Sequence, residues 1–125
     1  MIHLTLDEAL HVVRRTVGSD ALVRDPGLLQ AAVARPAATV GRQDVSPTLV
    51  DKAAALVHST VRNRALVDGD ERLGRMLLVV FLGVNGRTLT MSNDQECAFI
   101  VAIADGRLDD VEAIAAQFRG AATPS

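Results

Sequence analysis

Apolar residues in this chain of 125 residues recur at every third or fourth position, in six segments separated by helix-breaking residues. This spacing places apolar side chains on one face of an α-helix. Helices are therefore expected over 6–17, 26–35, 47–63, 73–84, 93–104 and 110–118. The pattern predicts an all-α fold, a compact bundle of about six helices, with residues 37–45 as a loop or flap and a short strand near 87–91.

Most of the predicted helix starts carry a capping signal. Ser, Thr or Asp followed three residues later by Glu or Gln forms a capping box, and Pro after a capping residue starts a helix. The pairs are Thr5 with Glu8, Asp25 with Pro26, Ser46 with Pro47, Ser92 with Gln95, and Asp109 with Glu112. These signals fix where the predicted helices begin.

The core expected from this composition consists of small and branched aliphatic side chains. Hydrophobic residues make up 49% of the chain but aromatic residues only 2%, so Phe81, Phe99 and Phe118 are its few large members. A chain of this length buries one core rather than two. We expect a single helical domain over residues 1–119 and a disordered tail over 120–125.

Charge and hydropathy argue against two classes of partner. The net charge is -2 and the pI about 5.8, so no basic face for nucleic acid is expected, and no apolar run is long enough to span a membrane. Cys97 is the single cysteine, which rules out an internal disulfide and fits a reducing, cytoplasmic location. Its apolar neighbours predict that Cys97 is buried.

The polar stretch from Arg64 to Arg75 is the candidate chemical site. It leads from one strongly apolar helix directly into the start of the next. Free backbone N–H groups and the positive end of the helix dipole favour an anion there. Gly69 allows a ligand to approach the backbone closely, and Arg72 and Arg75 supply fork-shaped donors.

The same stretch, together with residues 24–29, 34–36, 52–59, 61–63 and 81–86, resembles a known family. That family is the Fic/Doc (Fido) superfamily, and within it the Doc (death on curing) toxins of toxin–antitoxin systems. The superfamily signature, His-x-Phe-x-Asp/Glu-Ala/Gly-Asn-Lys/Gly-Arg, falls on residues 64–72. Asp68, Gly69 and Arg72 match the signature.

The resemblance implies a transferase that uses ATP and Mg²⁺. In the family the signature histidine accepts a proton, and the acidic residue, here Asp68, holds the metal. The following residues, here Gly69, Asp70, Arg72 and Arg75, cradle the phosphates. Most Fic proteins transfer AMP to a hydroxyl group, whereas Doc toxins phosphorylate elongation factor Tu.

The resemblance also implies two protein-binding features. One is a flap beside the site, which corresponds here to residues 27–41. The other is a hydrophobic groove that binds the C-terminal segment of an antitoxin. An antitoxin-like peptide or protein is therefore the expected partner, and a translation elongation factor the expected target.

Four positions of the signature differ in this chain: Arg64 replaces the histidine, Leu66 the phenylalanine, Asp70 the asparagine and Glu71 the lysine. A guanidinium is a permanent cation near neutral pH and cannot accept a proton there. Asp70 and Glu71 add negative charge where a triphosphate is expected to bind. These differences predict a degenerate site.

A purely structural interpretation of the same residues is also open. Asp68 as N-cap with Glu71 three residues later forms a capping box, and acidic residues stabilise the first turn of a helix. Arg64 can then pair with Asp68 or Asp70. Under this interpretation the stretch starts a helix and binds no ligand.

The sequence leaves several functions open. The first is a Doc-like toxin-family protein that has lost or greatly weakened its transfer activity and still binds protein. The second is an active toxin that transfers phosphate or AMP to a translation factor, with His58 or a metal-bound water as base. The third is a helical module unrelated to nucleotides. His58 lies six residues before Arg64, and a hydrogen-bonded helix histidine is its simpler interpretation.

Overall fold

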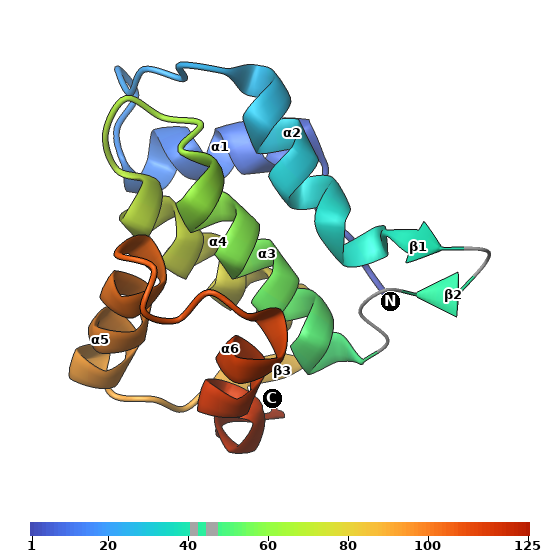
Figure 1. Cartoon of the computed structure of the whole chain (residues 1–125). Helices are drawn as coiled ribbons and strands as arrows, with labels where there is room; N and C mark the ends of the chain where they lie inside the picture. The colour runs from blue at the N-terminus through green and yellow to red at the C-terminus, as the bar shows by residue number, and fades with distance from the viewer. Residues whose placement is uncertain (41–42, 45–47) are drawn as a thin grey trace.

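The structure is a computed structural model that describes residues 1–40, 43–44 and 48–125 (Figure 1). Its helices are α1 (Leu6–Thr16), α2 (Pro26–Ala34), α3 (Leu49–Asn63), α4 (Asp70–Val84), α5 (Asn93–Ala104) and α6 (Val111–Phe118), with two short 3₁₀ helices, η1 (Arg35–Ala37) and η2 (Arg119–Ala121). The strands are β1 (Thr39–Val40), β2 (Gln43–Asp44), β3 (Arg87–Leu89) and β4 (Ala122–Pro124). The predicted all-α bundle of about six helices is confirmed.

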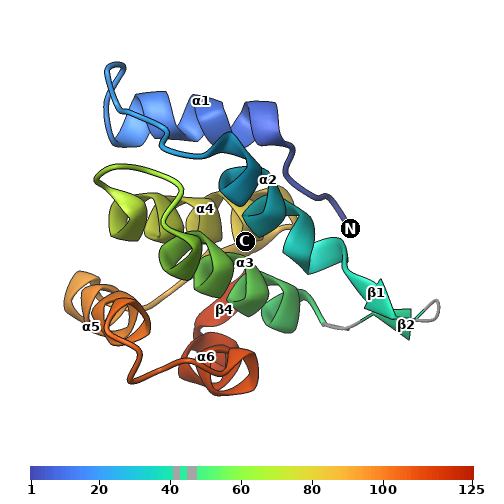
Figure 2. The ribbon, with the colours of Figure 1, turned by 45° about the horizontal axis from the view of Figure 1, so that its top comes forward.

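Helices α3 and α4 form the centre of the molecule. The two views show α1 and α2 on one side of this pair and α5 and α6 on the other (Figures 1 and 2). Leu56 of α3 and Leu77 of α4 are fully buried, as are Phe81 and Phe118. A Cβ atom at Gly74 would lie 2.6 Å from Cγ2 of Val61, so the two central helices are in close contact at this glycine.

Local capping signals predicted several helix starts correctly. The side chain of Thr5 accepts from the backbone of Glu8, and Ser92 accepts from Gln95; both capping boxes are complete. Asp25 caps α2 as expected. The N-termini of these helices are therefore set largely by residues within the same turn.

Two predicted caps differ from the structure. Helix α3 is capped by Thr48, whose side chain accepts from the backbone of Asp51, while Ser46 and Pro47 lie outside the described residues. Helix α6 is capped by Asp110 and not by Asp109. Neighbouring aspartates have the same capping propensity, and Asp109 instead binds His58 of α3 at 2.9 Å.

The segment after Asn85 forms a small two-stranded sheet with the end of the described chain. Strands β3 and β4 are antiparallel, and Leu89 pairs with Ala122. The predicted strand near 87–91 is confirmed, and β4 lies within residues 120–125, the segment predicted as a disordered tail. The residues 37–45 predicted as a loop or flap contain β1 and β2, which pair through Thr39 and Asp44.

Two further expectations concern the burial of Cys97 and membrane-spanning segments. Cys97 is exposed, so the prediction that it is buried is wrong. Only one side of α5 packs on the core, through Phe99, Ile100 and Ile103, and Cys97 does not lie on that side. Among the described residues, no helix has both the length and the apolar character needed to cross a bilayer.

Candidate functional site

The site loop, residues 64–69, is anchored to the segment before α2. Arg64 is the C-cap residue that follows α3, and its backbone is in the left-handed conformation, with φ 53° and ψ 51°. The backbone N–H of Val67 donates to Leu22 at 3.0 Å, and that of Arg24 donates to Ala65 at 2.7 Å. These hydrogen bonds hold the loop against a segment about 40 residues earlier in the sequence.

The side chain of Asp70 binds the backbone of the site loop. This side chain is buried, and one carboxylate oxygen accepts a hydrogen bond from the backbone of Leu66 at 3.0 Å. Burial raises the pKa of the Asp70 carboxyl; the hydrogen bond from Leu66 and the nearby charges of Arg64 and Arg24 act in the opposite direction but are smaller. Asp70 therefore has a structural role in the loop.

Because burial raises the pKa of Asp70, folding favours its protonated form, and its charge lowers stability at neutral pH. We expect Asp70→Asn, which keeps the oxygen that accepts from Leu66, to melt at a higher temperature than the natural chain at pH 7. The difference should shrink as the pH falls towards 3.8, the usual pKa of an aspartate, because the natural carboxyl also becomes protonated there. Thermal unfolding followed by circular dichroism across this range measures it. A pH-independent difference would contradict the assigned cause.

The start of α4 has no side-chain cap. Its N-cap is Gly69, with φ 98°, and no side chain accepts from the first turn at this position. The predicted capping box of Asp68 and Glu71 is therefore wrong: α4 begins at Asp70, and both carboxylates are exposed. The first-turn amides are thus free of a capping side chain, as an anion site at a helix N-terminus requires.

A cleft of about 360 Å³ lies at this helix start. It is lined by Arg64, Val67, Asp68, Gly69, Asp70, Glu71 and Arg72. The structure thus brings together five of the seven residues that the sequence analysis selected. Arg75 and His58 are the two that do not line the cleft.

Arg75 is directed at α5. Its guanidinium lies 3.3 Å from the carboxylate of Glu96 and 2.8 Å from the side-chain oxygen of Asn93. The hydrogen bond to Glu96 raises the pKa of Arg75. Because Glu96 is buried and needs a cation, Arg75 is engaged in an ion pair rather than positioned for a phosphate in the cleft.

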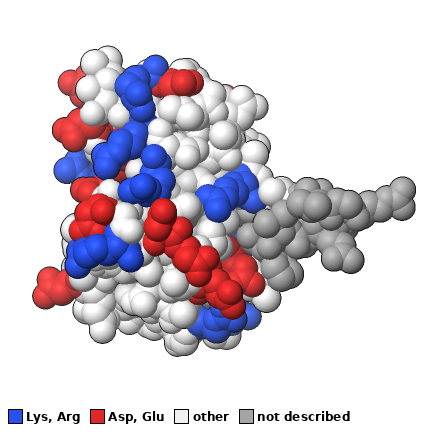
Figure 3. Space-filling model, viewed as in Figure 1, with Lys and Arg blue, Asp and Glu red and all other residues white. Residues whose placement is uncertain are grey.

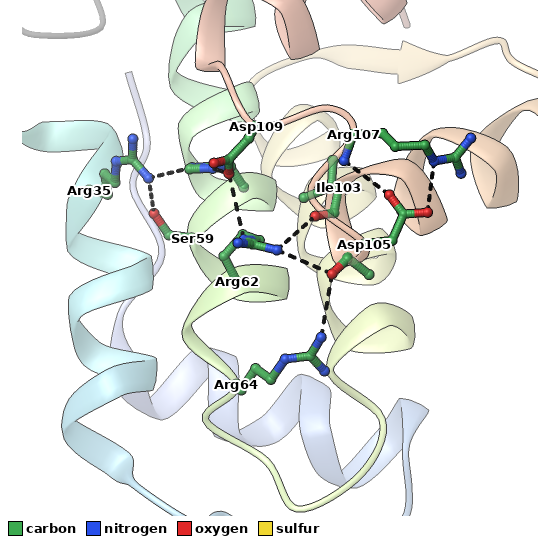
Figure 4. Close-up of polar contacts among 10 residues, drawn as sticks. Arg35, Ser59, Arg62, Arg64, Ile103, Asp105, Arg107 and Asp109 are labelled. Atoms are coloured by element: carbon green, nitrogen blue, oxygen red, sulfur yellow. Dashed lines mark hydrogen bonds and ion pairs between the residues drawn. The ribbon is translucent and has the colours of Figure 1, made fainter.

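His58 is held between two charged partners. Its Nε2 atom lies 2.9 Å from Asp109, and its Nδ1 atom lies 2.7 Å from the guanidinium of Arg35, which also donates to Ser59 (Figure 4). An Nδ1 atom that accepts from Arg35 requires the Nε2 atom to carry the proton and donate to Asp109. The structure therefore matches the simpler interpretation of a hydrogen-bonded helix histidine.

The side chain of Arg64 reaches the end of α5. It donates to the backbone oxygen of Ala104 at 3.4 Å, and Arg62 donates to the same oxygen at 3.2 Å (Figure 4). Cations are favourable at the negative end of a helix. Within the described part of the chain, Arg64 forms no ion pair with Asp68 or Asp70, so the predicted pairing is not found.

The cleft can be compared with what Mg²⁺ and ATP require. Asp68 and Glu71 offer exposed carboxylate oxygens, which are the ligands that Mg²⁺ prefers. No group of three or more metal-binding side chains occurs among the described residues. The cleft therefore offers the carboxylate oxygens of Asp68 and Glu71 and, at position 64, a guanidinium, which has donors but no acceptor.

The sequence analysis missed the residues before α2 that contact the site loop. Arg24 donates from its side chain to the backbone oxygen of Arg64. The segment around it contributes a bridge between Val23 and Leu66. Arg24 lies in a run that the family resemblance included, but nothing in its local pattern indicated a contact 40 residues away.

Comparison with known proteins agrees with this architecture. The model of the Fic/DOC family matches residues 3–82, which include α1 to α3, most of α4 and the whole cleft, and the chain belongs to this family. A curated relative is 42% identical over 124 residues, with 96% of this chain and 95% of the relative covered. That relative is named Toxin Doc and comes from Mycolicibacterium smegmatis (strain ATCC 700084 / mc(2)155). The resemblance to Doc-type toxins is thereby confirmed.

Proposed function

We propose that this Doc-like toxin-family protein catalyses phosphoryl or nucleotidyl transfer weakly or not at all, and that it acts through protein binding. The observation that carries the proposal is Arg64. It occupies the position of the signature histidine and lines the cleft, and its guanidinium has donors but no atom that accepts a proton from a substrate. Loss of a general base alone removes about 10²- to 10⁴-fold of rate.

The acidic residues of the cleft support the same proposal. Asp68 and Glu71 are exposed at the start of α4, where the phosphates of ATP would bind. Each carboxylate repels a triphosphate and offsets the attraction of the helix dipole. Mg²⁺ held by Asp68 would offset part of this repulsion, so metal-dependent nucleotide binding without efficient transfer is the expected behaviour.

A second candidate function is an active toxin that transfers phosphate or AMP to a translation factor. The hydrogen bond from His58 to Asp109 favours it, since a carboxylate orients an imidazole for proton transfer in many enzymes. Against it, the Nδ1 atom of His58 faces Arg35, and His58 does not line the cleft. If His58 is the base of this active toxin, His58→Ala abolishes transfer; if a metal-bound water is the base, His58→Ala leaves transfer unchanged.

The name of the relative supports an antitoxin-like peptide or protein as partner. An open groove of about 680 Å³ beside α5 suits a peptide with apolar side chains. Its apolar lining includes Met91, Ala98, Phe99, Ala102, Leu108 and Ala121. We place the partner in this groove and the chain in the cytoplasm.

Label transfer tests the proposed loss of activity. The chain is incubated with Mg²⁺, elongation factor Tu and ATP labelled at either the α- or the γ-phosphate, and Asp68→Ala is run beside it. We expect both proteins to give the same background signal. Strong labelling by the natural chain that Asp68→Ala abolishes would refute the proposal.

A further inference from the structure

Three arginines from two segments converge at the end of α3. Arg62 and Arg64 both donate to the backbone oxygen of Ala104, at 3.2 and 3.4 Å. Arg24 donates through Nε to the backbone oxygen of Arg64 at 3.1 Å. All three residues are exposed, and Figure 3 shows Lys and Arg side chains gathered over this part of the face seen in Figure 1. We call these three residues the arginine cluster.

The arginine cluster has few carboxylates at contact distance, although Asp70 and Asp105 lie near enough for their charges to act on it. Arg62 lies 3.5 Å from Asp109, a carboxylate that also binds His58. Arg24 and Arg64 have no carboxylate within ion-pair distance among the residues that the structure describes. At contact distance the described residues thus give the cluster three guanidinium groups and one carboxylate, on a chain whose net charge is -2.

The guanidinium groups are held in place while some of their donors remain available. A guanidinium has five N–H donors, and Arg64 uses one of its nitrogens, Nη2, for Ala104. Arg24 uses Nε and Nη2 for the oxygen of Arg64, and its Nη1 has no partner in the described chain. Side chains that are already ordered lose less entropy on binding, and a planar fork matches a carboxylate.

We propose that the arginine cluster is a docking surface for an acidic segment of a partner polypeptide. Its complementarity is electrostatic, since its free donors suit the carboxylates of Asp and Glu side chains. The inference rests on the protein-binding part of the proposed function and names a second contact, apart from the apolar groove beside α5.

The surroundings favour a short acidic peptide over a nucleic acid. Asp105 and Asp109 on one side and Asp68 on the other are exposed near the cluster. A nucleic acid has a continuous line of phosphates, which would lie over these carboxylates, and its binding proteins present an extended basic face. A short peptide places its carboxylates on Arg24, Arg62 and Arg64 alone.

The test is fluorescence anisotropy of the full chain with a labelled oligoglutamate peptide, a matched oligoglutamine peptide and a single-stranded oligonucleotide. We expect binding of oligoglutamate that weakens with added salt and no binding of oligoglutamine. Arg24→Gln combined with Arg64→Gln should weaken binding by about tenfold or more, since a charge-assisted hydrogen bond contributes at least 1.4 kcal/mol in such pairs. The double variant Arg24→Lys with Arg64→Lys keeps both positive charges and should retain most of the affinity for oligoglutamate.

Arg14→Gln on α1, which removes an exposed arginine outside the cluster, is the matched control and should change the affinity by less than about twofold. Absence of oligoglutamate binding, equal loss in the control, or tighter binding of the oligonucleotide would each overturn the docking surface. These results do not depend on label transfer. A chain that transfers label but binds oligoglutamate through the cluster would refute the proposed loss of activity and keep this inference.

Discussion

The triple variant Arg64→His, Asp70→Asn and Glu71→Lys is expected to transfer label from ATP about 10²- to 10⁴-fold faster than the natural chain. The first change supplies a base at the position of the signature histidine. Histidine tolerates the left-handed backbone at position 64 better than most residues do. The second keeps the hydrogen bond from Leu66, and the third replaces a repulsive carboxylate by a cation at the phosphate position.

The matched control for this prediction carries Gln at position 64 with the same changes at Asp70 and Glu71. It should bind Mg²⁺ and ATP as the triple variant does but transfer at background, because an amide accepts no proton. Growth arrest on expression in cells, together with label transfer to elongation factor Tu, measures the gain. If the triple variant stays at background although calorimetry shows that it binds ATP, the differences at these three positions do not account for the proposed loss of activity.

Gly74→Ala is expected to lower the free energy of unfolding by about 1–3 kcal/mol. The added Cβ would lie 2.6 Å from Cγ2 of Val61, so α3 and α4 must move apart or Val61 must leave its rotamer. Val61 is buried and its branched side chain is stiff, which makes relief by rotation costly. Urea unfolding followed by circular dichroism measures the change.

Gly83→Ala in the same helix is the control. A Cβ at Gly83 would meet no atom within 4 Å, so only the helix propensity changes, and the variant should be more stable by about 0.5–1 kcal/mol. A lower free energy of unfolding for Gly74→Ala and a higher one for Gly83→Ala would establish the close contact of α3 and α4. If Gly74→Ala stabilised the protein as much as Gly83→Ala, that contact would not exist in solution.

The helices could be predicted because their signals are local. The capping boxes of Thr5 and Ser92 and the apolar period each lie within a few residues of sequence. Two differences between prediction and structure have distant causes. Asp109 and Asp110 are equally good caps, and contact with His58, 51 residues away, separates their roles. Strand β4 forms because residues 35 positions apart pair with each other.

The candidate site shows the same contrast between features with local sequence signals and features that depend on distant residues. The loop and the helix start at Gly69 could be located from sequence, and the family resemblance placed Arg64 within them. The partner of Arg75 could not, since Glu96 lies 21 residues later on another helix. The inward position of Asp70 was also missed, because a carboxylate in the first turn of a helix is ordinarily exposed to solvent and only the closed loop around Leu66 buries it.

The central claim is that a side chain which cannot accept a proton at position 64 silences this site. The most direct test compares single-turnover label transfer by two variants that both carry Asp70→Asn and Glu71→Lys, one retaining Arg64 and the other with Arg64→His. We predict background transfer with Arg64 and transfer about 10²-fold faster or more with histidine. Transfer by the variant that retains Arg64 at a rate within tenfold of its partner would contradict the claim.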